Sequence, residues 1–152
     1  MRTILIWLAL ALGGMFFALQ FAPSPVQPLV RSTTDPRVHL QIAGNPEVGA
    51  ILDRSCKDCH SNLTRVPWYD QVAPVSWMVS QHVNQGREVL NFSDWGSRQP
   101  TANEMQELCD AVSSGSMPLQ SYTLIHRKAI LSKHDVDTIC KVADTQSSSA
   151  GL

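Results

Sequence analysis

The sequence predicts an all-α protein, with a domain of about four helices behind an N-terminal transmembrane helix. Three observations lead to this fold class. The chain begins with a long uncharged apolar run, apolar side chains recur at helical spacing after residue 45, and helix-capping residues precede several of these repeats. We find no run of strands between these helical repeats that would indicate a βαβ pattern.

The apolar run extends from Ile4 to Leu19 and follows Arg2. It approaches membrane-spanning length, and positive charge at its amino end predicts that this end stays in the cytoplasm. We therefore interpret residues 1–22 as an uncleaved signal anchor. Removal as a signal peptide is the alternative, because Ala22-Pro23-Ser24 has small residues at suitable offsets for cleavage, although a proline would follow the scissile bond.

Residues 23–44 are rich in Pro, Ser, Thr and Gln, and their prolines favour extended chain. We interpret them as a linker, in which His39 is expected to be exposed rather than a metal ligand. The formal net charge of −1 provides no basic patch for nucleic acid, so we expect no nucleic-acid partner.

Residues 45–144 are expected to form one helical domain. The expected helix starts are, in chain order, Asn45-Pro46-Glu47, Pro74, the capping box Thr101–Glu104 and the capping box Ser132–Asp135. The second helix should run to about Leu90 and the third should stop near Gly115. The Ser-rich residues 145–152 are expected to be a disordered tail.

The run Cys56-Lys57-Asp58-Cys59-His60 has the C-x-x-C-H spacing of a covalent attachment site for c-type haem. On a helix, the side chains of Cys56 and Cys59 project from the same face, so their sulfurs can reach the two vinyl groups of one porphyrin. The sequence therefore predicts thioether bonds from Cys56 and Cys59, with His60 as the proximal ligand of the iron.

Two other kinds of site share this spacing. A thioredoxin-type redox pair would normally lie at a strand-to-helix turn of a βαβ unit, which this sequence does not predict. A zinc site would need further ligands nearby, and Cys109 and Cys140 lie far downstream and far apart. Haem is therefore the favoured cofactor.

The sixth ligand of the iron is predicted to be Met117, which lies in a loop directly before Pro118. Proline fixes the backbone beside the thioether, a weak and soft ligand. His126 and His82 remain alternatives, as does an open or water-bound iron. Met78 and Met105 fall on helical apolar stripes and are expected to pack in the core.

Cys109 and Cys140 lie on the apolar stripes of the third and fourth expected helices. In an oxidising compartment they are expected to form a disulfide, if the helices bring their Cα atoms within about 7 Å. Buried free thiols are the alternative. Arg65, in the loop after the haem motif, either pairs with a haem propionate or is exposed.

Several further segments resemble one family, the bacterial haem-binding domain family of small membrane-anchored c-type cytochromes. The resemblance covers about residues 45–143. It is carried by Cys56–Asn62, Pro67-Trp68-Tyr69, Ala73-Pro74-Val75-Ser76-Trp77, Gly86-Arg87, Asn91-Phe92-Ser93-Asp94-Trp95, Gly115-Ser116-Met117-Pro118, Tyr122 and His126. It implies a small cytochrome-like helical haem domain on the periplasmic side of a bacterial inner membrane, with covalent haem on Cys56 and Cys59 and His60 on iron.

The expected function is single-electron transfer by a low-spin haem ligated by His60 and Met117. The expected partners are an unidentified redox protein and the membrane, in which the N-terminal helix anchors the chain. We expect an electron carrier rather than an enzyme, since the sequence shows no candidate catalytic dyad or triad. The alternatives are a haem-based sensor, in which Met117 leaves the iron, and a peroxidase with His126 as distal acid and base.

Overall fold

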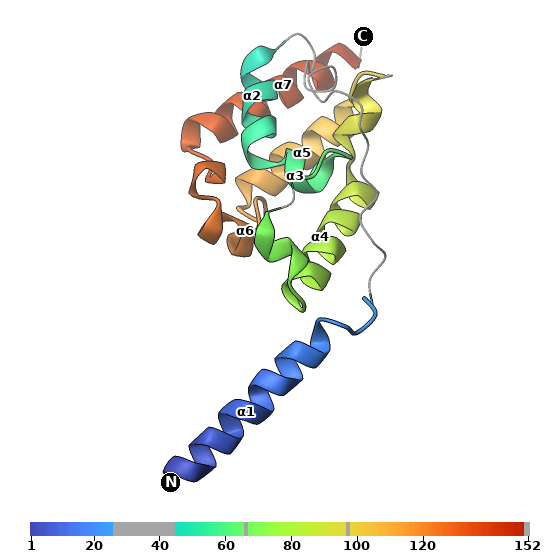
Figure 1. The fold of residues 1–152 in the computed structure, drawn as a ribbon. Helices are drawn as coiled ribbons and strands as arrows, with labels where there is room; N and C mark the ends of the chain where they lie inside the picture. Colours follow the sequence, from blue (N-terminus) through green and yellow to red (C-terminus); the bar gives the residue numbers. More distant parts are fainter. Residues whose placement is uncertain (26–44, 66, 97, 151–152) are drawn as a thin grey trace.

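The computed structural model of the chain describes residues 1–25, 45–65, 67–96 and 98–150. In these ranges the chain forms helices and no strand, which confirms the all-α prediction. The elements are α1 (Arg2–Leu19), α2 (Pro46–Ser55), α3 (Lys57–His60), η3 (Trp68–Gln71), α4 (Val75–Val89), η4 (Phe92–Gly96), α5 (Ala102–Ser113), α6 (Gln120–Ile125), η5 (Arg127–Ala129) and α7 (Lys133–Ala150), where η marks a 3-10 helix. Figure 1 shows α1 projecting away from the helices that follow it.

Helix α1 is the one helix in the described part of the chain that is long and apolar enough to cross a membrane. None of its residues is buried against the rest of the protein. A membrane-spanning helix and a signal sequence share this length and apolar composition. The expected linker lies almost entirely in residues 26–44, outside the described residues, and His39 lies there too.

Helix α2 begins as the sequence predicts. The Asn45 side chain accepts hydrogen bonds from the backbone N–H groups of Glu47 and Val48, at 3.0 and 3.2 Å. The helix ends at Ser55 because Cys56 leaves the helical conformation (φ −127°, ψ −31°), and the chain resumes as α3. This break was not predicted, and it separates the haem motif from the helix that precedes it.

The later helices also begin at their predicted caps. Thr101 forms a complete capping box with Glu104 at the start of α5. Before α7, the Ser132 hydroxyl accepts the Asp135 N–H at 3.1 Å, and the Asp135 carboxylate accepts the Ser132 N–H at 2.7 Å. Local hydrogen bonds between neighbouring residues therefore set the starts of both helices.

The core lies between α2, η4, α5 and α7. Its buried members are Val48, Ile51, Leu52, Phe92, Trp95, Met105, Leu108, Cys109, Val112, Ile139 and Ala143. Met105 is fully buried, as predicted for a packing methionine, but Met78 is 45% exposed. The apolar stripe of α2 thus shares one core with side chains of α5 and α7, directly before the haem motif in the chain.

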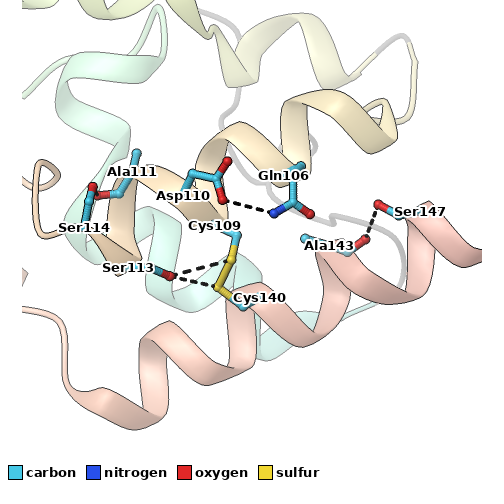
Figure 2. Close-up of a disulfide and its surroundings, with 9 residues drawn as sticks. All are labelled: Gln106, Cys109, Asp110, Ala111, Ser113, Ser114, Cys140, Ala143 and Ser147. Atoms are coloured by element: carbon cyan, nitrogen blue, oxygen red, sulfur yellow. Dashed lines mark hydrogen bonds between the residues drawn. A yellow bond between two sulfur atoms is a disulfide. The ribbon is translucent and has the colours of Figure 1, made fainter.

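Helices α5 and α7 pack against each other and are joined by a disulfide in the structure (Figure 2). The Cα atoms of Cys109 and Cys140 are 4.9 Å apart, within the usual range of about 4.4–6.8 Å. The Ser113 hydroxyl lies 3.3 Å from the Cys140 sulfur. The bridge links the two helices within the core, where Cys109 is buried and Cys140 packs against the same cluster.

The C-terminal segment differs from the expected disordered tail, since α7 continues to Ala150. Serine and threonine side chains along this part of the helix bond back to carbonyls of the preceding turn. The Ser147 hydroxyl donates to the Ala143 carbonyl at 3.1 Å, as Figure 2 shows, and the Ser148 hydroxyl donates to the Asp144 carbonyl at 2.9 Å. These hydroxyls are satisfied within the helix, so a Ser-rich composition does not end it.

Candidate haem-binding site

A cavity of about 410 Å³ lies between α3, α4, α5 and the loop that precedes α6. Cys56, Cys59, His60 and Met117 all line it. Much of the remaining wall is apolar and includes Val89, Leu90, Phe92, Leu108 and Val112. Its volume is typical of a cofactor site, and its donor set of two thiols, one imidazole and one thioether fits a c-type haem.

His60 is held in one orientation at the wall of this cavity. Its Nδ1 atom lies 2.9 Å from the carbonyl oxygen of Leu90, at the end of α4. This hydrogen bond selects the tautomer with a proton on Nδ1, which leaves the lone pair of Nε2 free for a metal. Burial lowers the pKa of His60, so the ring is neutral, as ligation requires.

The two thiols of the motif are not reactive thiolates. Burial raises the pKa of Cys56 to about 12 and that of Cys59 to about 11. A thioredoxin-type pair requires the opposite shift, toward a lowered pKa. The redox-pair interpretation is therefore disfavoured. Within the described residues, no group of three or more His, Cys, Asp or Glu side chains is placed so that it could hold a metal ion.

The loop after the motif is tied to α4 and η4. The Arg87 guanidinium donates to the Ser61 carbonyl at 2.8 Å and to the Thr64 hydroxyl at 2.9 Å. The Asn62 N–H donates to the Ser93 hydroxyl at 2.9 Å. Phe92, fully buried, lies with its ring centroid 5.7 Å from that of His60. These contacts fix the backbone on the His60 side of the cavity.

Helices α3 and α4 meet at a glycine. A Cβ atom added to Gly86 would lie 3.0 Å from the Cys59 carbonyl oxygen and 3.5 Å from the Cys59 Cβ. A side chain at this position would crowd the backbone of the second cysteine, against which α4 packs closely. A glycine inside an amphipathic helix is a sequence signal for such a close approach, but the sequence does not say which segment approaches.

We expect Gly86→Ala to destabilise the holoprotein by about 1–2 kcal/mol, because overpacking against a backbone carbonyl outweighs the gain in helix propensity. Urea unfolding followed by the haem absorption would measure this change. Gln81→Ala, at an exposed position of the same helix, is the matched control and should change the free energy of unfolding by less than about 0.5 kcal/mol. If the Gly86 variant and the parent have equal free energies of unfolding, the prediction is wrong, and α3 can shift to accommodate the added methyl group.

Met117 is positioned by the end of α5. Gly115 adopts φ +71°, a left-handed conformation that turns the chain after the helix. The Met117 N–H then donates to the Ala111 carbonyl at 3.1 Å. The loop is thus bonded back onto α5, and Met117 contributes to the cavity wall.

The two alternative histidine ligands lie in different places. His82, on α4, lines the same cavity as His60 and Met117. His126 does not line it: its Nε2 atom lies 2.5 Å from the Tyr69 hydroxyl oxygen, and its ring stacks on Tyr122 with centroids 4.2 Å apart. His126 instead borders a smaller cavity of about 90 Å³, which Cys59 and His82 also line. Met117 and His82 are the sixth-ligand candidates that share the larger cavity with His60.

Tyr122 joins α6 to the haem motif, a link that the sequence does not reveal. Its hydroxyl donates to the Asp58 carboxylate at 2.8 Å, and its ring lines the cavity. Asp58 also pairs with Arg65, whose Nε lies 3.3 Å from the carboxylate. Arg65 is therefore engaged with the motif itself, which disfavours the propionate contact considered from the sequence. Tyr122 and Asp58 are 64 residues apart, so only the fold brings them together.

The comparisons with known proteins agree with this site. The model of a protein family described as haem-binding domain matches residues 14–145 of the chain. No curated protein and no solved structure matches significantly. The family match spans most of the sequence and includes every residue that lines the cavity. The chain belongs to the haem-binding domain family.

Proposed function

We propose that the protein carries a covalently attached c-type haem and transfers single electrons on the periplasmic side of a bacterial inner membrane. The observation that supports this most is the shared cavity of Cys56, Cys59, His60 and Met117. The haem iron, when bound, supplies the one-electron redox change. The remaining chemistry is structural: the chain holds the group, excludes water from it and keeps its ligands fixed.

Each residue has a defined part in this proposal. Cys56 and Cys59 provide the thioether bonds, and His60 provides Nε2 to the iron while its other nitrogen stays on the Leu90 carbonyl. Met117 would provide its thioether sulfur as the second protein ligand of the iron. Ligands held by helix ends and backbone hydrogen bonds move little when the charge of the iron changes, which favours electron transfer over ligand exchange.

The alternatives, a sensor or a peroxidase, require an iron that is open to exogenous ligands. His126, the distal acid and base considered from the sequence, is bonded to Tyr69 and lies outside the cavity wall. His82 does line the cavity and is the residue that would support such chemistry. Electron transfer is preferred because Met117, the predicted sixth ligand, lines the same cavity as His60 and would close the iron to exogenous ligands.

An optical spectrum of the purified full-length holoprotein tests this proposal. We expect a low-spin ferric haem with a methionine-to-iron charge-transfer band, and slow or no binding of carbon monoxide after reduction. Rapid binding of carbon monoxide by the parent protein would instead support the sensor or peroxidase.

The proposed periplasmic location predicts that Cys109 and Cys140 form a stabilising disulfide. In an oxidising periplasm the bridge should be present, and closing a loop over a sequence separation of 31 residues should stabilise the fold by about 2–4 kcal/mol. Denaturant unfolding of Cys109→Ala/Cys140→Ala should show this loss. A phosphine reductant should lower the stability of the parent to that of the variant and leave the variant unchanged. Labelling of both thiols in the unreduced, unfolded parent would contradict the prediction.

A further inference from the structure

The end of helix α1 is hydrogen-bonded to the haem domain at Ala73. Gln20, the residue that follows α1, donates from Nε2 to the Ala73 carbonyl oxygen at 3.1 Å and accepts the Ala73 N–H on Oε1 at 3.1 Å. Ala73 lies between η3 and α4. Figure 1 shows this part of the domain on the side that faces α1. The edge formed by η3 and the start of α4 is therefore held at the end of the apolar helix.

Exposed aromatic side chains accompany this contact. Trp68, the first residue of η3, is 77% exposed, and Phe21, directly after Gln20, is 75% exposed. Amphipathic aromatic rings are enriched where membrane proteins cross from lipid to water. In water alone these rings would expose apolar surface without compensation.

The same surface continues onto α6 and η5. The Tyr69 hydroxyl lies 2.5 Å from His126 Nε2, which places the end of α6 beside η3. Leu124 and Ile125 are 65% and 64% exposed. Next to them, Arg127 and Lys128 are exposed and form no ion pair with any side chain in the described part of the chain. Apolar and unpaired basic residues thus share one face.

We propose that this membrane-facing surface, defined by Trp68, Leu124, Ile125, Arg127 and Lys128, rests on the periplasmic leaflet of the bilayer that α1 spans. The apolar side chains enter the headgroup region, and the two basic side chains lie beside anionic phospholipid headgroups. Mixed surfaces of this kind bind anionic membranes through buried apolar area together with charge attraction.

Two observations favour lipid over a protein as the occupant. The surface is continuous with the end of α1 through the Gln20–Ala73 hydrogen bonds, so a bilayer around α1 lies next to it. Arg127 and Lys128 form no ion pair within the described residues, and their positive charge complements anionic headgroups. The inference rests on the proposed membrane span, and it fixes the orientation of the haem cavity relative to the membrane.

The test uses the full-length holoprotein in vesicles of phosphatidylcholine and phosphatidylglycerol. Leu124→Cys is labelled with a fluorescent dye, and its emission is compared in vesicles with and without a lipid that carries a nitroxide near the headgroup. The ratio cancels the constant quenching by haem. A side chain in the interface should lose roughly half of its emission or more. Ser148→Cys, labelled in the same way, is the control, because the C-terminal end of α7 lies on the side of the domain away from α1 in Figure 1.

A charge-reversal variant tests the role of the basic pair. Arg127→Glu/Lys128→Glu should reduce quenching of the label at position 124. Without the charge reversal, quenching of this label should also be weaker in vesicles of phosphatidylcholine alone, which lack anionic lipid. If the label at position 124 is quenched no more than the label at position 148, the surface is free for a partner protein and the proposal is wrong. Alkaline extraction of the same vesicles checks the span separately, so failure of the anchor and failure of the docking surface are distinguished.

Discussion

The variant Cys56→Ala/Cys59→Ala should contain no covalently bound haem. In denaturing gels the parent chain should carry haem-dependent peroxidase stain, whereas the variant should carry none. The physical reason is that thioether bonds survive unfolding, while ligation by His60 and Met117 depends on the folded cavity that holds them. Each single variant, Cys56→Ala or Cys59→Ala, should yield less holoprotein and an absorption spectrum shifted by the remaining vinyl group.

The matched control for this experiment is Cys109→Ala/Cys140→Ala, which also removes two cysteines. It should retain full haem stain, because these residues lie in the α5–α7 contact and do not line the cavity. Covalent haem in the Cys56→Ala/Cys59→Ala variant, or loss of covalent haem in the control, would contradict the assignment of the attachment site.

The starts of the helices could be predicted from the sequence because they depend on neighbours. The Asn45 side chain accepts hydrogen bonds from residues two and three positions later, and Thr101 and Ser132 bond to residues three positions later. One helix break and one helix end were missed. Cys56 interrupts the helix where the motif turns toward the cavity, and α7 continues beyond residue 145 because its serine hydroxyls bond within the helix.

The candidate site likewise contains residues that local motifs predict and partner residues that only the fold brings near them. Cys56, Cys59 and His60 form one local motif, and Met117 precedes a proline, so single segments indicated all four residues. The partners that orient them are distant in sequence. The Leu90 carbonyl bonds His60 across 30 residues, and Gly86 accommodates the backbone of Cys59. The exclusion of His126 from the cavity wall likewise follows from its contacts with Tyr69 and Tyr122, which no local pattern contains.

The variant Met117→Ala should keep haem attached through Cys56 and Cys59 and ligated by His60, but should open the sixth position to water. The iron should then shift toward high spin, and the methionine charge-transfer band should disappear. The reduction potential should fall by on the order of 100 mV, because the soft thioether that favours the reduced iron is lost. Carbon monoxide should bind the reduced variant rapidly and the parent slowly or not at all.

Three further variants give this prediction its controls. Met78→Ala removes a methionine that is 45% exposed and does not line the cavity, and its spectrum and potential should match those of the parent. Met117→His should restore a low-spin iron at a potential below that of the parent, since a second imidazole favours the oxidised state more than a thioether does. If Met117→Ala instead keeps the low-spin spectrum and potential of the parent, Met117 only packs against the haem. His82→Ala is then the decisive variant, because His82 is the one histidine besides His60 among the described cavity-lining residues. In that case the His82 variant, and not the Met117 variant, should contain high-spin iron.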